Sequence, residues 1–216
     1  MGEISADTAH TAAFWDERYA GSEPVWSGRV NQRLVEQTGP LMPGAALDIG
    51  CGEGGDAVWL AGQGWTVLAV DVSVVVIDKA RAHAVAALDG EVAGRITWQQ
   101  ADLRTWQPPA GSFDLVSMQF LQLPRAVLTD TQARLAVAVR PGGTLLIVNH
   151  DLLDLHTTAG RPNLPEMFLT VDEIAATLDS DCWRAEVVES FQRPFTDHDG
   201  NPITIHDAVV RAVRLP

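Results

Sequence analysis

The sequence predicts an α/β fold: a mostly parallel β-sheet, doubly wound with helices on both faces, that ends in an antiparallel hairpin. Short apolar runs alternate with longer helical patterns between residues 45 and 150, as in consecutive strand–helix–strand units. A glycine-rich turn follows the first of these runs. Near the end of the chain, Asp199-Gly200 lies between two segments of alternating polarity, which is a hairpin signal. A length of 216 residues favours one domain with one hydrophobic core.

The first five strands are short apolar runs bounded by turn residues. They are expected over residues 45–50, 65–71, 95–100, 113–118 and 144–149. Helices are expected between them. The first covers residues 56–61 and ends at Gly62 and Gly64, the second runs from its cap Ser73 to about residue 88, and the last stops at Arg140-Pro141-Gly142-Gly143.

The two ends of the chain differ in character from this central part. Residues 1–40 contain large aromatic residues without a strand pattern and are expected to form helices that lie over the sheet. Residues 151–169 contain prolines and lack a clear period, which predicts a loop or lid. The chain is expected to close with a helix from Thr170 or Asp172 to residue 178 and with strands over 186–195 and 203–215.

Charge and composition exclude several classes of function. The chain has 15 Lys and Arg against 28 Asp and Glu, a formal net charge of −13, and it has no basic run. Such a surface repels a phosphate backbone, so nucleic acid is not expected as a partner. The single lysine, Lys79, does not lie in a Gly-Lys-Ser/Thr sequence, which excludes a P-loop. The single tyrosine, Tyr19, lacks the lysine that completes the Tyr-x-x-x-Lys pair of short-chain dehydrogenases.

Cysteine usage and hydropathy predict a soluble, cytoplasmic protein. The two cysteines, Cys51 and Cys182, are too few for a disulfide framework and fit a reducing compartment. The first 20 residues show no secretory signal, and no apolar stretch approaches the roughly 20 residues of a membrane helix. No membrane partner is expected, and the protein is expected to be a monomer or a homodimer. The six histidines are scattered and no Cys-x-x-Cys occurs, so no metal site is expected.

A glycine loop after the first strand predicts a cofactor site. Gly50-Cys51-Gly52-Glu53-Gly54-Gly55 follows a strand and opens a helix, as the dinucleotide-binding turn of Rossmann-like folds does. Asp71 ends the second strand, near the position expected for an acid that binds ribose hydroxyls. A tight turn that binds no ligand is the alternative for these residues.

The charges around this loop favour a cationic cofactor. Asp48, Glu53 and Asp56 surround it, and no Lys or Arg occurs from residue 45 until Lys79. An acid within ~4 Å of a pyrophosphate would cost about 1 to 4 kcal/mol, whereas the same acid attracts a cation. S-adenosylmethionine carries a sulfonium and an α-ammonium, so the loop favours it over NAD(P). An NAD(P)-linked oxidoreductase and a non-catalytic module that binds S-adenosylmethionine stay as the alternative functions.

Five short motifs follow one another along the chain. They are LDIGCGEG at residues 47–54, VDVS at 70–73, QADL at 100–103, FDLV at 113–116 and RPGG at 140–143. In this order they resemble the motifs of class I S-adenosylmethionine-dependent methyltransferases, over residues 45–150. The resemblance implies a seven-stranded sheet in the order 3-2-1-4-5-7-6. Phe14-Trp15-Asp16 and residues 25–31 more loosely resemble the N-terminal region of the small bacterial tellurite-resistance and thiopurine methyltransferases.

The resemblance also implies how the motifs bind the cofactor. The backbone of Gly50–Gly54 approaches the methionine part, Asp48 anchors the α-ammonium and Asp71 holds both ribose hydroxyls. Val72 packs on adenine, and Asp102 accepts from the adenine amino group, unless Asp102 is simply a loop acid or a cap. The residues implied by the motifs and by the end of the fourth strand are Asp48, Gly50, Cys51, Gly52, Asp71, Val72, Ser73, Ala101, Asp102, Leu103, Ser117, Met118 and Gln119.

Other residues are candidates for covering the cofactor and for chemistry on the acceptor. Trp26 and Arg29 precede the first strand and are expected to cover the cofactor, with Arg29 pairing with its carboxylate, although a packed tryptophan and a surface arginine fit the same pattern. His150 follows the fifth strand and is the candidate base for a hydroxyl acceptor, with Asp151 as its orienting neighbour. A purely structural histidine is the alternative. Gln122 stands where many relatives carry a histidine, so no base is expected there.

The prediction for the whole chain is one methyltransferase domain over residues 1–216. Residues 1–40 form a helical cap or lid, residues 41–150 the cofactor-binding core, and residues 151–216 a substrate-side loop, helix and hairpin. The expected reaction is transfer of a methyl group from S-adenosylmethionine to a small molecule by in-line displacement, with alignment and exclusion of water as the main sources of rate. Oxygen, nitrogen, sulfur and metalloid acceptors all stay open.

Overall fold

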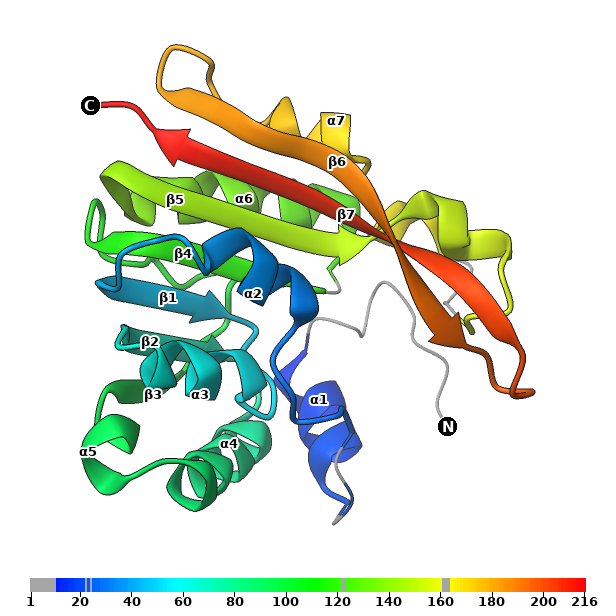
Figure 1. Cartoon of the computed structure of the whole chain (residues 1–216), viewed down its shortest axis with the longest axis horizontal. Helices are drawn as coiled ribbons and strands as arrows, with labels where there is room; N and C mark the ends of the chain where they lie inside the picture. The colour runs from blue at the N-terminus through cyan, green and yellow to red at the C-terminus, as the bar shows by residue number, and fades with distance from the viewer. Residues whose placement is uncertain (1–10, 22, 24, 122, 161–163) are drawn as a thin grey trace.

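One sheet of seven strands forms the centre of the protein in the computed structural model, which describes residues 11–21, 23, 25–121, 123–160 and 164–216 (Figure 1). The strands are β1 Ala45–Ile49, β2 Thr66–Asp71, β3 Ile96–Gln100, β4 Phe113–Gln119, β5 Val139–His150, β6 Trp183–Thr196 and β7 Pro202–Arg214. Their order is β3-β2-β1-β4-β5-β7-β6, which confirms the predicted topology. Gln122 lies outside the described residues.

The strand directions also confirm the prediction. β1 to β5 are parallel to one another, whereas β7 is antiparallel to both β5 and β6. The chain leaves β1 toward β2 on one side and enters β4 on the other side of β1. Ligands of open α/β sheets bind at such a switch point, outside the carboxyl ends of the strands. The crevice between the ends of β1 and β4 is therefore the place where a site is expected.

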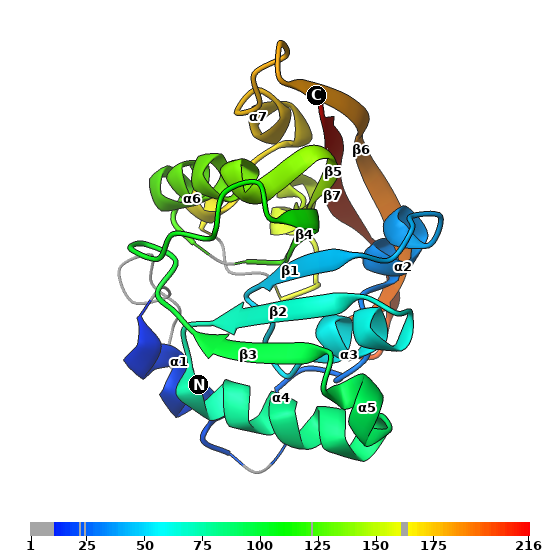
Figure 2. The same ribbon diagram turned by 90° about the vertical axis from the view of Figure 1, so that its left-hand side faces the viewer.

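Helices cover both faces of the sheet. They are α1 Ala12–Tyr19, α2 Gln32–Thr38, α3 Gly55–Gly62, α4 Val74–Ala87, α5 Gly90–Ala93, α6 Arg125–Ala138 and α7 Val171–Ala175. Figure 2 shows α2 and α3 on one side of the sheet and α6 and α7 on the other. The predicted cap of α4 is present, because Ser73 Oγ accepts the N–H of Val76 at 3.2 Å.

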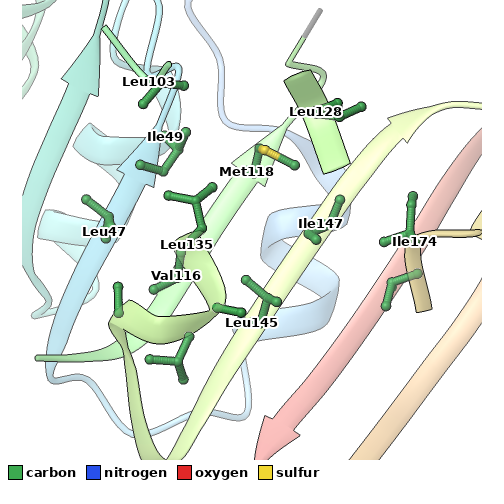
Figure 3. Close-up of a cluster of buried hydrophobic side chains, with 14 of the residues drawn as sticks. Leu47, Ile49, Leu103, Val116, Met118, Leu128, Leu135, Leu145, Ile147 and Ile174 are labelled. Atoms are coloured by element: carbon green, nitrogen blue, oxygen red, sulfur yellow. The ribbon is translucent and has the colours of Figure 1, made fainter. Parts of the chain in front are cut away.

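Two hydrophobic clusters fill the spaces between the sheet and these two layers. Successive strand residues point to opposite faces. Leu47 therefore packs in the cluster that contains Leu128 and Leu135 of α6 (Figure 3), whereas Ala46 packs in the cluster that contains Leu60 of α3. Burial on both faces explains why the central strands are continuous apolar runs.

Several boundaries differ from the predicted ones. β5 begins at Val139 rather than residue 144, because Val139 pairs with Phe113 ahead of an irregularity in the β4–β5 register. The helix α5 has four residues, which is too short to show a helical period. Residues 152–156 and 165–167 of the predicted loop form the 3₁₀ helices η1 and η2. α7 begins with the predicted cap at Thr170 but ends at Ala175, ahead of residue 178.

The segments outside the central strands gather at one end of the sheet. Figure 1 shows α1 and the far end of the β6–β7 hairpin at the end of the sheet to which β1 and β5 point. α1 is attached there by Asp16, whose Oδ1 accepts the hydroxyl of Ser73 at 2.6 Å.

None of the helices in the described part of the chain is both long enough and apolar enough to cross a membrane.

Candidate active site

A cavity of about 650 Å³ opens at the carboxyl ends of the parallel strands. Its walls come from the N-terminal segment, the glycine loop, the ends of β2, β4 and β5, and the far part of the β6–β7 hairpin. The cavity is lined by many of the residues predicted from the sequence, namely Trp26, Arg29, Asp48, Gly50, Cys51, Gly52, Asp71, Val72, Asp102, Leu103, Gln119 and His150. It lies at the predicted switch point of the sheet.

The glycine loop makes a tight turn between β1 and α3. The amides of Gly50 and Cys51 both donate to Val70 O, at 2.8 and 3.1 Å, which holds the loop against β2. Gly54 has a φ of 83°, and a Cβ on it would lie 2.7 Å from the ring of Trp98. Glycine is therefore required there for both the backbone conformation and the space.

Asp71 connects the glycine loop to helix α4. Its Oδ2 accepts the N–H of Gly52 and its Oδ1 accepts the N–H of Ser73, both at 3.0 Å. Burial raises the pKa of this carboxyl group, and the backbone donors counteract part of that increase. An ionised carboxylate has about four acceptor positions, so two further donors, such as a pair of hydroxyl groups, fit the same side chain.

Asp48 is a buried acid in the wall of the cavity. Its side chain is almost completely buried, and its Oδ2 has no hydrogen-bond partner among the described residues. Burial raises the pKa of Asp48 well above its usual value, and the nearby carboxylates of Asp56 and Asp71 raise it further. A cationic group in the cavity would supply the missing partner and favour the ionised form. The residues present therefore fit the α-ammonium and sulfonium of S-adenosylmethionine.

The N-terminal segment is hydrogen-bonded to the glycine loop. Glu53 accepts the backbone N–H groups of Val25 and Trp26 at 3.0 and 2.9 Å. Asp56 accepts both the backbone N–H and the side-chain amide of Asn31 at 2.7 Å. Acidic residues of the loop therefore bind this segment as well as giving the cavity its negative charge.

Aromatic residues of the same segment form one wall of the cavity. The indole N–H of Trp26 donates to the hydroxyl of Tyr19 at 2.8 Å, and Tyr19 stacks on Trp15 with 5.7 Å between ring centroids. Burial raises the pKa of Tyr19, with the Asp71 charge as the next contribution, so the hydroxyl stays neutral. Trp26 and the side chain of Arg29 stay largely exposed at the mouth of the cavity.

The loop after β3 contributes Asp102 and Leu103 to the cavity. The carboxylate of Asp102 forms a bidentate pair with Arg104, with Nη2–Oδ2 at 2.5 Å and Nε–Oδ1 at 2.9 Å. Its oxygens already have a strong partner, and both residues are partly exposed. Ala101 does not line the cavity; its N–H donates to Asp71 O at 2.9 Å and continues the pairing of β2 with β3.

The end of β4 presents only part of the predicted set to the cavity. Ser117 and Met118 are fully buried and do not line it, whereas Gln119 does. Met118 lies in the cluster covered by α6, as Figure 3 shows. Ser117 accepts the side-chain N–H of Gln119 at 3.0 Å, so it orients that side chain. Ser73 also lies outside the cavity lining, where it caps α4.

His150 ends β5 and faces the cavity beside Phe120. The two rings lie 4.5 Å apart between centroids. Phe120 has a φ of 52°, an unusual conformation for a residue other than glycine and one that clusters at functional sites. The Oδ1 of Asp151 accepts the N–H of Leu153 at 2.9 Å and caps η1.

The structure adds residues that the sequence analysis did not identify. Arg33, Arg193, Phe195 and Asp207 line the end of the cavity that is formed by the hairpin and α2. Asp207 pairs with His150 in the β5–β7 register and accepts from both arginines. The sequence offers one signal for this cluster, which is an acid, Asp207, within an apolar strand. Its partners, Arg33 and Arg193, lie in other segments and could not be identified from the sequence.

Comparison with known proteins agrees with this geometry. Residues 46–143 match the methyltransferase domain family. An uncharacterized methyltransferase of Mycobacterium tuberculosis is 31% identical over 128 residues, which cover 57% of this chain and 59% of that protein. A 2-heptyl-1-hydroxyquinolin-4(1H)-one methyltransferase of Mycobacteroides abscessus is 27% identical over 169 residues, which cover 71% of this chain and 72% of that protein. The match to the first of these relatives therefore spans less than two thirds of its length.

Solved structures share the whole fold at lower identity. One, from a study of the conversion of a disulfide bond into a thioacetal group during echinomycin biosynthesis, has a TM-score of 0.72 at 24% identity and covers 94% of this chain and 92% of that chain. TehB from Haemophilus influenzae has a TM-score of 0.66 at 20% identity and covers 95% of this chain and 67% of that chain. The ordered motifs and the strand order of this chain agree with the match of residues 46–143 to the methyltransferase domain family.

Proposed function

We propose that the protein transfers a methyl group from S-adenosylmethionine to a small-molecule acceptor by in-line displacement. The observation that carries this proposal is the buried Asp48, whose Oδ2 lacks a hydrogen-bond partner in the described part of the chain and which lies among further acids at the glycine loop. A pyrophosphate there would meet several carboxylates, which disfavours NAD(P) as the ligand. S-adenosylmethionine supplies an electrophilic methyl group when bound.

The residues of the chain contribute mainly by binding and alignment. Asp48 pairs with the α-ammonium, and Asp71, held by Gly52 and Ser73, accepts from the ribose hydroxyls. The N-terminal segment, hydrogen-bonded to Glu53, limits the access of water to the cavity. Fixed geometry and exclusion of water lower the barrier of a displacement without any acid or base.

A base is needed only for some acceptors. His150 is the residue that removes a proton if the acceptor is a hydroxyl group, because its ring faces the cavity beside Phe120. A thiolate, a free amine or a metalloid anion is already a nucleophile and needs no base. We propose alignment as the main source of rate and His150 as the base for a hydroxyl acceptor.

The size and charge of the molecule support a small acceptor. A cavity of about 650 Å³ lies within the usual range of pockets for small molecules and cofactors. The net charge of −13 disfavours nucleic acid. The relative from Mycobacteroides abscessus is named for methylation of a small quinolone. Both cysteines are free, as is usual in a reducing compartment, and we propose that the protein is cytoplasmic. We also propose that it acts as a monomer or homodimer without a membrane partner.

Calorimetric titration with S-adenosylhomocysteine and with NADH tests the cofactor. Tight binding of the first and none of the second is expected, and the opposite result would establish the oxidoreductase alternative. Asp48→Asn should weaken the binding of S-adenosylhomocysteine, whereas Asp130→Asn, a change at an exposed surface pair, should leave it unchanged. Release of S-adenosylhomocysteine with an acceptor panel then tests transfer. Binding without any transfer would favour a non-catalytic module.

A further inference from the structure

Two arginines share one buried carboxylate at the hairpin end of the cavity. Asp207 on β7 is 1% exposed. Its Oδ2 accepts from Arg33 Nε at 3.1 Å, and both of its oxygens lie 3.0 Å from Arg193 Nε. A buried carboxylate with two such partners holds both guanidinium groups in place.

The two arginines differ in what they can offer to a ligand. Arg33 has an acceptor for each nitrogen, because Nη1 donates to Glu36 at 2.7 Å and Nη2 donates to Gln192 O at 3.0 Å. Arg193 donates only from Nε within the described structure, and its side chain is 26% exposed. Since Arg193 lines the cavity, its Nη1 and Nη2 are the donors that a ligand can reach.

The cavity therefore has ends of opposite charge. The glycine-loop end carries Asp48 and Asp71, which suit a cationic cofactor. At the hairpin end, the guanidinium groups of Arg33 and Arg193 share the one buried carboxylate of Asp207. Glu36 also pairs with Arg33, but its side chain is 37% exposed and it does not line the cavity. Arg193 shares Asp207 with Arg33, and its Nη1 and Nη2 have no acceptor among the described residues.

Aromatic groups adjoin this charge. The ring of Phe195 lies 6.0 Å from the guanidinium carbon of Arg193, and Phe120 and His150 line the same cavity. A flat apolar molecule with an anionic oxygen matches both features, because its body packs on the rings while its charge meets Nη1 and Nη2. A planar guanidinium binds a carboxylate with two parallel hydrogen bonds.

We propose that the methyl acceptor is an apolar, anionic molecule and that Arg193 determines specificity by binding its anionic oxygen. This proposal rests on the proposed methyltransferase function, because it identifies the substrate class of the same cavity. Asp207 acts as the positioning residue for Arg193. The acceptor end of the cavity then selects an anion while the cofactor end selects a cation, which orients the two molecules toward each other.

Calorimetry on the full chain saturated with S-adenosylhomocysteine tests the proposal with benzoate, naphthoate and octanoate, each compared with its own amide. At least one carboxylate should bind about tenfold more tightly than its amide, the effect of one charge-assisted pair. Arg193→Gln should abolish this preference and Arg193→Lys should retain part of it. Binding of every carboxylate no more tightly than its amide would overturn the proposal.

Two controls separate the possible causes. Arg184→Gln removes an exposed arginine from the same strand and should leave the preference for carboxylates unchanged. Affinity for S-adenosylhomocysteine should stay within about twofold in Arg193→Gln, and a larger loss would mean that Arg193 binds the carboxylate of the cofactor, which overturns the proposal. Failure of the unmodified protein to bind S-adenosylhomocysteine would instead count against the proposed function. Melting curves of each variant verify folding.

Discussion

Asp71 accepts the backbone N–H of Gly52 at 3.0 Å, so the acid at the end of β2 holds the glycine loop that follows β1. Its other oxygen accepts the N–H of Ser73 at the start of α4. One carboxylate thus joins the turn after β1 to the turn after β2. The organisation of the loop therefore depends on the side chain that we propose for binding of the ribose.

The first prediction concerns Asp71. Asp71→Ala should weaken the binding of S-adenosylmethionine by ~2 kcal/mol or more, about thirtyfold, because charge-assisted bonds to ribose and to the loop are lost together. Calorimetry measures the affinity. Asp78→Ala, an exposed acid on α4, is the matched control and should bind normally. Unchanged affinity in a folded Asp71→Ala protein would contradict the assigned site.

The second prediction concerns pH and Asp48. The pKa of this carboxyl group is raised, so the cofactor should bind more tightly as pH rises through that pKa, since only the ionised form pairs with the ammonium. Binding should take place with release of protons, which titration in buffers of different ionisation enthalpy detects. Asp48→Asn should weaken binding and reduce its pH dependence. An affinity independent of pH would exclude Asp48 as the anchor.

The same pKa shifts predict how the stability of the free protein depends on pH. Asp48, Asp56 and Asp71 all have raised pKa values in the folded state. Their contribution to the free energy of unfolding is fully present below the unfolded pKa of about 4 and is lost as pH rises through the folded values. S-adenosylhomocysteine should therefore raise Tm more at pH 8 than at pH 5. Thermal melts at both pH values, with and without the ligand, measure the difference.

The third prediction concerns the N-terminal segment. Hydrogen exchange between about residues 14 and 34 should slow when S-adenosylhomocysteine binds, because this segment is expected to close over the cofactor. Glu53→Gln should speed the exchange of Val25 and Trp26 in the free protein by weakening their hydrogen bonds. Glu91→Gln, at a highly exposed acid, is the control. Identical exchange with and without the ligand would mean that the segment is ordinary packing.

The fourth prediction separates two roles of His150. If the acceptor is a hydroxyl, His150→Ala should lower kcat by about 100-fold or more with little change in cofactor affinity, because the base matters only as the proton leaves. We expect the other outcome, a loss of about tenfold or less with the pH profile retained, because alignment and exclusion of water are proposed as the main sources of rate. His198→Ala on the exposed hairpin turn is the control.

Most of the fold and the cofactor end of the site follow from local sequence. Strands and helices appear as periods of two and 3.6 within a few residues, and a cap such as Ser73 acts within one turn. The glycine loop and Asp71 lie within about 20 residues of each other, so their spacing alone placed them together. The boundaries that differ, at β5 and α5, depend on pairing or on helices too short to show a period.

The acceptor end depended on tertiary structure. Arg33 and Asp207 are 174 residues apart, and only the sheet order and the β6–β7 register bring them to one cavity with Arg193. The exclusion of Ser117 and Met118 also became visible only in the structure: both are buried within β4, and only Gln119 at the end of that strand lines the cavity. The sequence by itself determined the fold and the charge of the cofactor loop, because both are local patterns. Tertiary packing alone decided which remote side chains line the hairpin end of the cavity, because those residues come from distant parts of the chain.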